Sequence, residues 1–216
     1  MYKTIIRNEN WKVSDGLNNT EEEFKDKEER IVLKRTYSNS EKHDTYYVYD
    51  IGGNLIYVLP PLLAEKEVIT EELINDLGYQ YKYNMRNLIA EKKVPGKGWE
   101  YFVYNTFDDK IVATQDAEQR KTGKGRFIKY DQYGRVIITG IFNFGNSRRN
   151  VQQAADNDEW WGYEVRSEKP IDGTQIYYTN NTFPEIIDKE QEILTINYYD
   201  SYVNTEAPIT TSVEGQ

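Results

Sequence analysis

The chain has 216 residues, a formal net charge of −9 and no cysteine. The lack of cysteine excludes disulfides and thiolate metal sites, and the acidic charge argues against non-specific nucleic-acid binding, which needs a basic surface. No apolar run reaches the roughly 18 residues of a membrane span, and no signal peptide is recognisable before Asn8. We therefore expect no nucleic-acid partner and no membrane-spanning segment.

Tyrosine dominates the apolar content. Aromatic residues make up 14% of the chain and 19 residues are tyrosines, whereas hydrophobic residues in total reach only 38%. A tyrosine combines a large apolar ring with a hydroxyl that can end at a wet surface. This composition predicts a thin, solvent-exposed sheet assembly more than a deep globular core.

The N-terminal part predicts a short strand at 4–6 and then a first hairpin within 21–37. In that hairpin Asp26 begins the turn and Glu29 stands at its end. The segment Ser38–Asp44 is polar, so we expect a loop that carries His43, the only histidine of the chain.

The clearest hairpin is Tyr47–Leu59, with the sequence YVYDIGGNLIYVL. Tyr47 and Tyr49 suit a half-buried strand. Asp50 stands where a turn needs a side chain that binds backbone N–H groups two residues on, and Gly53 stands where the chain often needs a positive φ. The structural turn residues predicted here are therefore Asp50 and Gly53.

Two short helical inserts are expected. Thr70 is a good N-cap, the two acidic residues after it favour a first helical turn, and Gly78 is a natural stop, so the pattern predicts a helix at about 70–77. A second short helix is expected within 146–158, where three small or apolar residues fall at helical spacing.

Three more copies of the hairpin follow the first helix. The third has Tyr81 and Tyr83 on one face of a strand, the fourth has Tyr101 and Tyr104 on opposite faces, and the fifth pairs Tyr130 with Asp131 and Gly134. The predicted turns begin at Asp26, Asp50, Asn84, Asn105 and Asp131.

These turn residues recur at intervals of 21 to 34 residues, and the longest interval contains the predicted helix. Such a period is typical of solenoids, propellers and spiral arrays, in which a unit buries its faces only when neighbours stack on it. We therefore expect a mainly β protein of antiparallel β-hairpin repeats, with one or two short helical inserts. The array would cover 1–200, and 201–216 would be a tail or a truncated strand.

The motif YxYDxxG(N/R)(L/V) resembles the YD repeat of RHS proteins. Its strongest matches are Tyr47–Leu55 and Lys129–Val136, and the stretches Ile5–Trp11, Val58–Pro61 and Pro95–Glu100 look like Bacteroidetes-type RHS repeat proteins. The resemblance implies a β-hairpin strip that spirals into a hollow shell, here as a fragment of the repeat region. It implies a bacterial, exported or cell-surface parent protein that encapsulates or displays a C-terminal toxin or effector.

The same resemblance implies that the partners are the remaining RHS repeats or a core domain of a larger chain. The self-cleaving core signature that normally follows the repeats has no match here. Further departures are Glu29 in place of glycine, Asn84 and Asn105 in place of aspartate, and Asp108 where glycine is usual. These departures predict less regular hairpins at the first, third and fourth copies.

No enzymatic site is expected. We predict no catalytic residue, no cofactor-binding residue and no metal ligand. His43 stands alone, so a triad or a two-histidine metal site lacks its second member. Gly123-Lys124-Gly125 lacks the serine or threonine that a phosphate loop requires. The acidic cluster Asp156, Asp158 and Glu159 lacks calcium-loop spacing. Asp50 and Asp131 repeat at one motif position, which indicates backbone capping rather than a catalytic pair.

The favoured interpretation is a structural, non-enzymatic shell segment that assembles through tyrosine-rich hairpins. The alternative is a cell-surface adhesion module that binds glycans, because exposed tyrosines and Trp99, Trp160 and Trp161 offer aromatic faces for sugar rings. Alternating tyrosines are also what a stacked sheet needs, which favours the structural interpretation.

Overall fold

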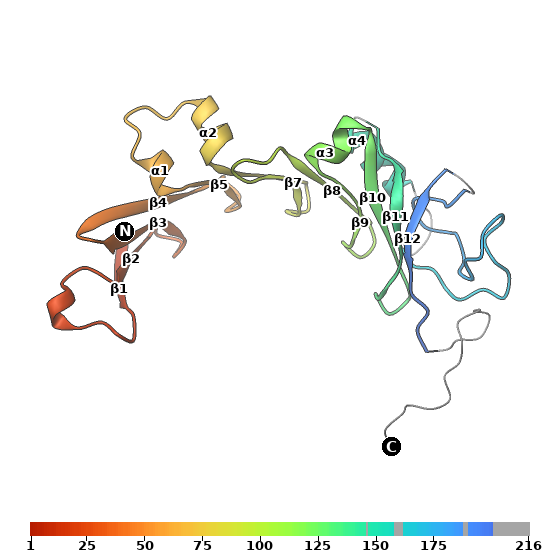
Figure 1. Cartoon of the computed structure of the whole chain (residues 1–216), viewed down its shortest axis with the longest axis horizontal. Coiled ribbons are helices and arrows are strands. Elements are labelled where there is room, and N and C mark those ends of the chain that lie inside the picture. Colours follow the sequence, from red (N-terminus) through yellow and green to blue (C-terminus); the bar gives the residue numbers. More distant parts are fainter. Residues whose placement is uncertain (146, 158–161, 188–189, 201–216) are drawn as a thin grey trace, which may run out of the picture. The chain divides into compact units, whose positions relative to one another are not determined.

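The computed structural model describes residues 1–145, 147–157, 162–187 and 190–200. Among these residues there are twelve strands, and within β1 to β7 and within β8 to β12 each strand lies beside its neighbour in sequence (Figure 1). The strands pair antiparallel in both groups, so the predicted class, mainly antiparallel β with a few short helices, is confirmed. Within the described part of the chain, no helix is both long and apolar enough to cross a membrane.

Residues up to Glu100 form one compact unit, unit 1, and those from Tyr101 onward form a second, unit 2. The predicted single array over 1–200 stays a prediction, and the predicted tail at 201–216 lies outside the described residues. The elements of unit 1 are β1 (Tyr2–Arg7), a 3-10 turn (Val13–Asp15), β2 (Thr20–Lys25), β3 (Ile31–Ser38), β4 (Glu41–Tyr49), β5 (Leu55–Leu59), α1 (Pro61–Ala64), α2 (Glu71–Leu77), β6 (Tyr79–Tyr83) and β7 (Ile89–Lys93).

Unit 1 is stabilised mainly by contacts across its strands. Its only buried apolar side chains among the described residues are Leu63 and Ala90. Cross-strand ion pairs line the sheet instead, with Nζ–O distances of 2.8 Å for Lys34–Glu21 and Lys82–Glu91. Arg35 binds Asp44 through two hydrogen bonds of 2.6 and 2.8 Å. Opposite charges on facing strands contribute a fraction of a kcal/mol each, roughly 0.2–1.

The helix predicted at 70–77 is α2, and Thr70 caps it by accepting a 3.2 Å bond from the Leu73 N–H. The loop predicted at Ser38–Asp44 is wrong. Asn39 and Ser40 have φ of 52° and 66°, which is the geometry of a two-residue hairpin turn, and β4 already begins at Glu41. His43 therefore lies on a strand.

Unit 2 contains β8 (Glu100–Tyr104), β9 (Ile111–Gln115), α3 (Ala117–Lys121), β10 (Lys124–Tyr130), β11 (Val136–Asn143), α4 (Arg148–Asp156) and β12 (Glu192–Ile196). Helix α4 is the helix predicted within 146–158, whereas α1 and α3 had no prediction. Glu164 and Arg166 form isolated β-bridges with Asp131 and Tyr178.

Unit 2 has a true apolar core. Val103, Phe127 and Ile138 are fully buried, because the segment between β11 and β12 folds back over one face of the sheet. That segment contributes α4 and residues 162–187. The core side chains from it are Val151, Ala155, Ile171, Ile176, Tyr178 and Ile186.

Candidate functional site: the capped turns and the joints between them

Five hairpins end in turns of one design, which we call turns 1 to 5. In each, the backbone N–H of the first residue donates to the carbonyl of the last, over 2.8–3.0 Å. The turns are Asp26–Arg30, Asp50–Asn54, Asn84–Leu88, Asn105–Lys110 and Asp131–Arg135.

The first residue of each turn caps it with its side chain. Asp50 Oδ1 accepts a 2.8 Å bond from the Asn54 N–H, and Asp131 Oδ1 accepts bonds of 2.9 Å from the N–H groups of Tyr133 and Arg135. Asn84 achieves the same with an amide oxygen, which accepts 3.0 Å from the Leu88 N–H. A neutral amide therefore replaces the carboxylate without changing this bond.

Each turn also has a residue with a positive φ near its end, which explains the glycine at that position of the motif. Gly53 and Gly134 have φ of 85° and 77°, which glycine adopts without steric cost. Glu29 and Asn87 hold the same position at 63° and 58°, so turns 1 and 3 are as tight as turns 2 and 5. The lower regularity predicted for those two copies is wrong.

Turn 4 is one residue longer than the others. Asn105 pairs with Lys110, five residues on, and the positive φ of 59° belongs to Asp109. The sequence-based alignment of Asp108 with the usual glycine was therefore displaced by one residue. Asn105 Oδ1 still caps the turn, accepting 2.7 Å from the Phe107 N–H.

Each of these hairpins also carries a β-bulge at the same place. The ladder shifts at the strand residue just before the turn, so one residue of the return strand is skipped, which strengthens the local twist. The skipped residues are Val32, Ile56, Ala90, Val112 and Ile137.

The tyrosine before a turn joins it to the preceding hairpin. The hydroxyl of Tyr49 donates to the Ile31 carbonyl at 2.9 Å, and that of Tyr83 donates to the Leu55 carbonyl at 2.9 Å. Each acceptor is the first residue of the preceding return strand. In unit 2 the matching bonds run from Tyr130 to Ile111 at 2.8 Å and from Tyr199 to Val136 at 3.1 Å.

The other predicted repeat aromatics differ in burial. Tyr47, Tyr81 and Tyr101 lie half-buried on their strands, and Tyr104 is buried at the end of β8. The backbone N–H and carbonyl of Tyr104 are both bound by the Gln152 amide, at 3.0 and 2.8 Å. Sequence reasoning missed Tyr199 as a joint residue, although the pair Tyr199-Asp200 repeats the tyrosine–aspartate signal.

Removing one joint hydroxyl tests its contribution. We expect Tyr83→Phe to lower the free energy of unfolding by about 1 kcal/mol, because the Leu55 carbonyl loses its donor. Urea unfolding of the full chain measures the change. The control is Tyr79→Phe on the same strand, where the side chain is 36% exposed. Equal stability of the two variants would contradict the joint.

The environment of the capping carboxylates lowers their pKa values. For Asp50 the cause is the hydrogen bonds donated by the side chain and backbone of Asn54. For Asp26 and Asp131, partial burial acts to raise the pKa, but hydrogen bonds from Arg30 and Arg135 outweigh it, so these pKa values are also lowered. Burial raises the pKa of Tyr83 and keeps its hydroxyl protonated as a donor.

A lowered pKa in the folded state makes turn 2 sensitive to acid. Asp50 contributes stability above its ordinary pKa of 3.8, and this contribution is lost as the pH falls through the lower folded value. We therefore expect Asp50→Asn to reduce the drop in melting temperature between pH 7 and pH 3. The control is Asp76→Asn on the exposed side of α2, and an unchanged acid dependence in Asp50→Asn would contradict the assignment.

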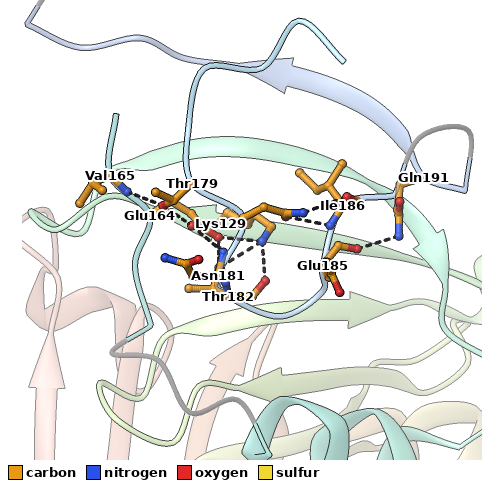
Figure 2. Close-up of polar contacts among 10 residues, drawn as sticks. Lys129, Glu164, Val165, Thr179, Asn181, Thr182, Glu185, Ile186 and Gln191 are labelled. Carbon is orange, nitrogen blue, oxygen red and sulfur yellow. Dashed lines mark hydrogen bonds and ion pairs between the residues drawn. The ribbon is translucent and has the colours of Figure 1, made fainter. Parts of the chain in front are cut away.

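A buried ion pair fastens the covering segment of unit 2 to the sheet. Figure 2 shows Lys129 of β10 reaching Glu164, and their Nζ–Oε1 distance is 2.9 Å. Lys129 also donates to the carbonyl and hydroxyl of Thr182, and Glu164 accepts from the Thr179 hydroxyl and from the N–H groups of Asn181 and Thr182. Both charged side chains have no exposed surface.

These contacts determine the charge state of the pair. Burial acts to raise the pKa of Glu164, but the Lys129 charge and the hydrogen bonds outweigh it, so the pKa lies below its ordinary value. The acceptor positions of the ionised carboxylate are occupied, which is typical of a structural ion pair. We call the Lys129–Glu164 pair the staple.

The remaining candidate groups of the sequence belong to different elements. The Nδ1 atom of His43 is 3.8 Å from Glu65 Oε1. Gly123 lies between α3 and β10, and Lys124 and Gly125 are the first two residues of β10. Asp156 accepts from Thr106, while Asp158 and Glu159 lie outside the described residues. Among the residues that the structure describes, no three histidine or acidic side chains group as a metal site would require.

Comparisons with known proteins give limited matches. No protein-family model and no curated protein matches the chain. A crystal structure of TcdB2-TccC3-Cdc42 is similar over 68% of this chain, with 19% identity and a TM-score of 0.45. One of TcdB2-TccC3-TEV is similar over 57%, with 16% identity and a TM-score of 0.44. The chain spans only 6–7% of those chains, so no activity or partner follows from them.

Proposed function

We propose that this chain is a structural, non-enzymatic segment of an RHS/YD-repeat shell. The observation that carries the proposal is the recurrence of one turn, one bulge and one tyrosine joint in successive hairpins. A catalytic site uses a constellation once, whereas an assembly built by stacking uses the same contact at every step.

The proposal assigns the tyrosines to assembly. Each joint hydroxyl donates to a backbone carbonyl beside the bulge of the preceding hairpin. This side-chain bond holds neighbouring hairpins together in addition to the backbone hydrogen bonds between their strands. The polar, ion-paired faces of unit 1 suit a wall that water reaches, and the core of unit 2 anchors one stretch of it.

The proposal places the chain in a larger, exported or cell-surface bacterial protein, whose remaining repeats or core domain are its partners. It extends to a toxin-associated role, in which the shell encapsulates or displays a C-terminal effector. These parts rest on the resemblance of Tyr47–Leu55 and Lys129–Val136 to the YD repeat.

Imaging of the complete gene product tests the proposal. Cryo-electron microscopy of the whole protein is expected to show a hollow β wall, with residues 1–200 as a continuous part of it. A separately folded domain at these residues, outside any wall, would overturn the shell role.

Glycan binding is the competing function, and a hollow of about 480 Å³ beside turn 5 is where it would be sought. Tyrosines line this hollow, but guanidinium groups already lie over their rings. Arg135 is 5.0 Å from the ring centre of Tyr133 and 4.4 Å from that of Tyr199, and Arg166 is 5.5 Å from that of Tyr178. Occupied ring faces favour packing over sugar stacking.

A glycan array on the isolated chain separates the two functions. Tyr133 is 72% exposed, so Tyr133→Ala removes the most accessible ring of the hollow without disturbing the core. We expect no binding to any glycan by either the chain or the variant. Strong binding that the substitution abolishes would replace the structural proposal.

A further inference from the structure

The last residue of a turn lies against the next turn in the sheet. The Arg30 guanidinium of turn 1 is 5.0 Å from the ring centre of Tyr49, beside turn 2. A Cβ atom built on Gly53 would lie 3.6 Å from Arg30 Nη1. The cation of one turn therefore fills the space beside the glycine of the next.

The same contact recurs in unit 2 and is tighter there. Lys110 Nζ of turn 4 is 5.5 Å from the ring centre of Tyr130. A Cβ atom on Gly134 of turn 5 would lie 3.0 Å from Lys110 Cε and 3.2 Å from its Nζ. Because these distances are shorter than ordinary contacts, a side chain at Gly134 would push the end of the lysine aside by a few tenths of an ångström. Glycine at this position thus allows the positive φ of its own turn and also leaves space for the cation of the preceding turn.

Turns 2 and 3 meet through a different pair. Turn 2 ends in Asn54, whose Nδ2 donates a 3.2 Å bond to Asn87 Oδ1. Asn87 occupies the positive-φ position that glycine holds in turns 2 and 5. Two asparagine side chains thus face each other between turns 2 and 3, whereas a long cationic side chain faces a glycine between turns 1 and 2 and between turns 4 and 5.

We propose that these two residues form a matched pair that selects which hairpin can lie next to which. The pair consists of the last residue of one turn and the positive-φ residue of the following turn. A turn that ends in arginine or lysine accepts a hairpin with tyrosine before its capping residue and glycine at the positive-φ position. A turn that ends in asparagine accepts a hairpin with asparagine there.

The selectivity has a steric and an electrostatic part. A long cation lies in the space beside the glycine, where a Cβ atom would touch Arg30 at 3.6 Å and crowd Lys110 at 3.0 Å, and it gains a cation–π contact with the tyrosine that precedes the accepted turn. The short side chain of asparagine cannot reach that ring, and its amide donates instead to the amide oxygen of the asparagine on the next turn. This inference rests on the proposed function, because it specifies how neighbouring repeats recognise each other.

Converting the amide pair into the cation pair tests the inference. The variants are Asn54→Arg, Asn87→Gly and both together in the full chain. Asp50 offers the introduced guanidinium the same partner that Asp26 offers Arg30, whose Nε donates to Asp26 Oδ2 at 2.8 Å. The readout is the melting temperature.

The double variant is expected to melt about 2–4 °C above the sum of the single changes, because only it combines the cation with the space it needs. The matched control combines Asn54→Arg with Glu29→Gly, which changes a positive-φ position on the other side of turn 2. That pair is expected to be additive. Additive changes in Asn54→Arg/Asn87→Gly would overturn the matched pair.

A second double-mutant cycle keeps the inference testable if one of these variants fails to fold. In unit 2, Gly134→Ala is expected to reduce the effect of Lys110→Ala, because the added methyl group pushes the end of the lysine away from its place beside the ring. Equal effects of Lys110→Ala in both backgrounds would also refute the inference. Neither result bears on the hollow wall sought by microscopy, so failure of the pairing and failure of the shell role are distinguishable.

Discussion

Lys129→Met is expected to lower the free energy of unfolding of unit 2 by about 3–5 kcal/mol, the largest effect of any single change proposed for this chain. The substitution leaves Glu164 charged in a site with no exposed surface, and an unpaired buried charge is strongly destabilising. It also removes the donor to the Thr182 carbonyl and frees the covering segment from β10. Chemical unfolding followed by tryptophan fluorescence measures the loss.

Two further variants sharpen this expectation. Lys129→Met combined with Glu164→Leu is expected to recover much of the loss, because a buried pair replaced by apolar residues is often neutral or better. Arg126→Met on the same strand is the matched control, since Arg126 is exposed and its charge stays hydrated. A Lys129→Met protein within 1 kcal/mol of the wild type would contradict the staple.

Gly140→Ala is expected to cost about 3 kcal/mol. A Cβ atom at this position would lie 2.5 Å from Phe127 Cε1 and 2.6 Å from the Glu192 carbonyl oxygen. Phe127 is fully buried and Glu192 belongs to the backbone of β12, so neither can move without disturbing the core or the ladder. Thermal and urea unfolding of unit 2 within the full chain measure the loss.

A smaller side chain at position 127 tests whether the close approach is the cause. In the Phe127→Leu background, Gly140→Ala is expected to cost about 1 kcal/mol less, because the ring atoms that it meets are gone. The contact with Glu192 persists, so the rescue is partial. A Gly140→Ala variant as stable as the wild type would show that β12 does not approach β11 as described.

The five turns were predictable because their signals are local. An aspartate or asparagine binds backbone N–H groups within four residues, and glycine satisfies the positive φ nearby. The same locality explains the error at turn 4. One inserted residue shifts the positive φ from Asp108 to Asp109, and a motif without glycine gives no sign of the shift.

The joints were only partly predictable. Alternation places Tyr49 and Tyr83 on strands, but their acceptors depend on which carbonyl of the neighbouring hairpin lies opposite. The bulge sets that register, and it leaves no signal in a strand as regular as Leu55–Leu59. Polar composition likewise misassigned Ser38–Asp44, because a hairpin of two positive-φ residues needs little sequence beyond Asn39 and Ser40.

The hairpin, its turn residues and its repetition can all be read from the sequence, because each depends on contacts within a few residues. The contacts that hold the covering segment of unit 2 on its sheet depend on the tertiary fold. The Lys129–Glu164 staple joins residues 35 apart, and the Gln152–Tyr104 contact joins residues 48 apart. Such partners become neighbours only when a whole segment folds back over the sheet, and no local pattern encodes that path.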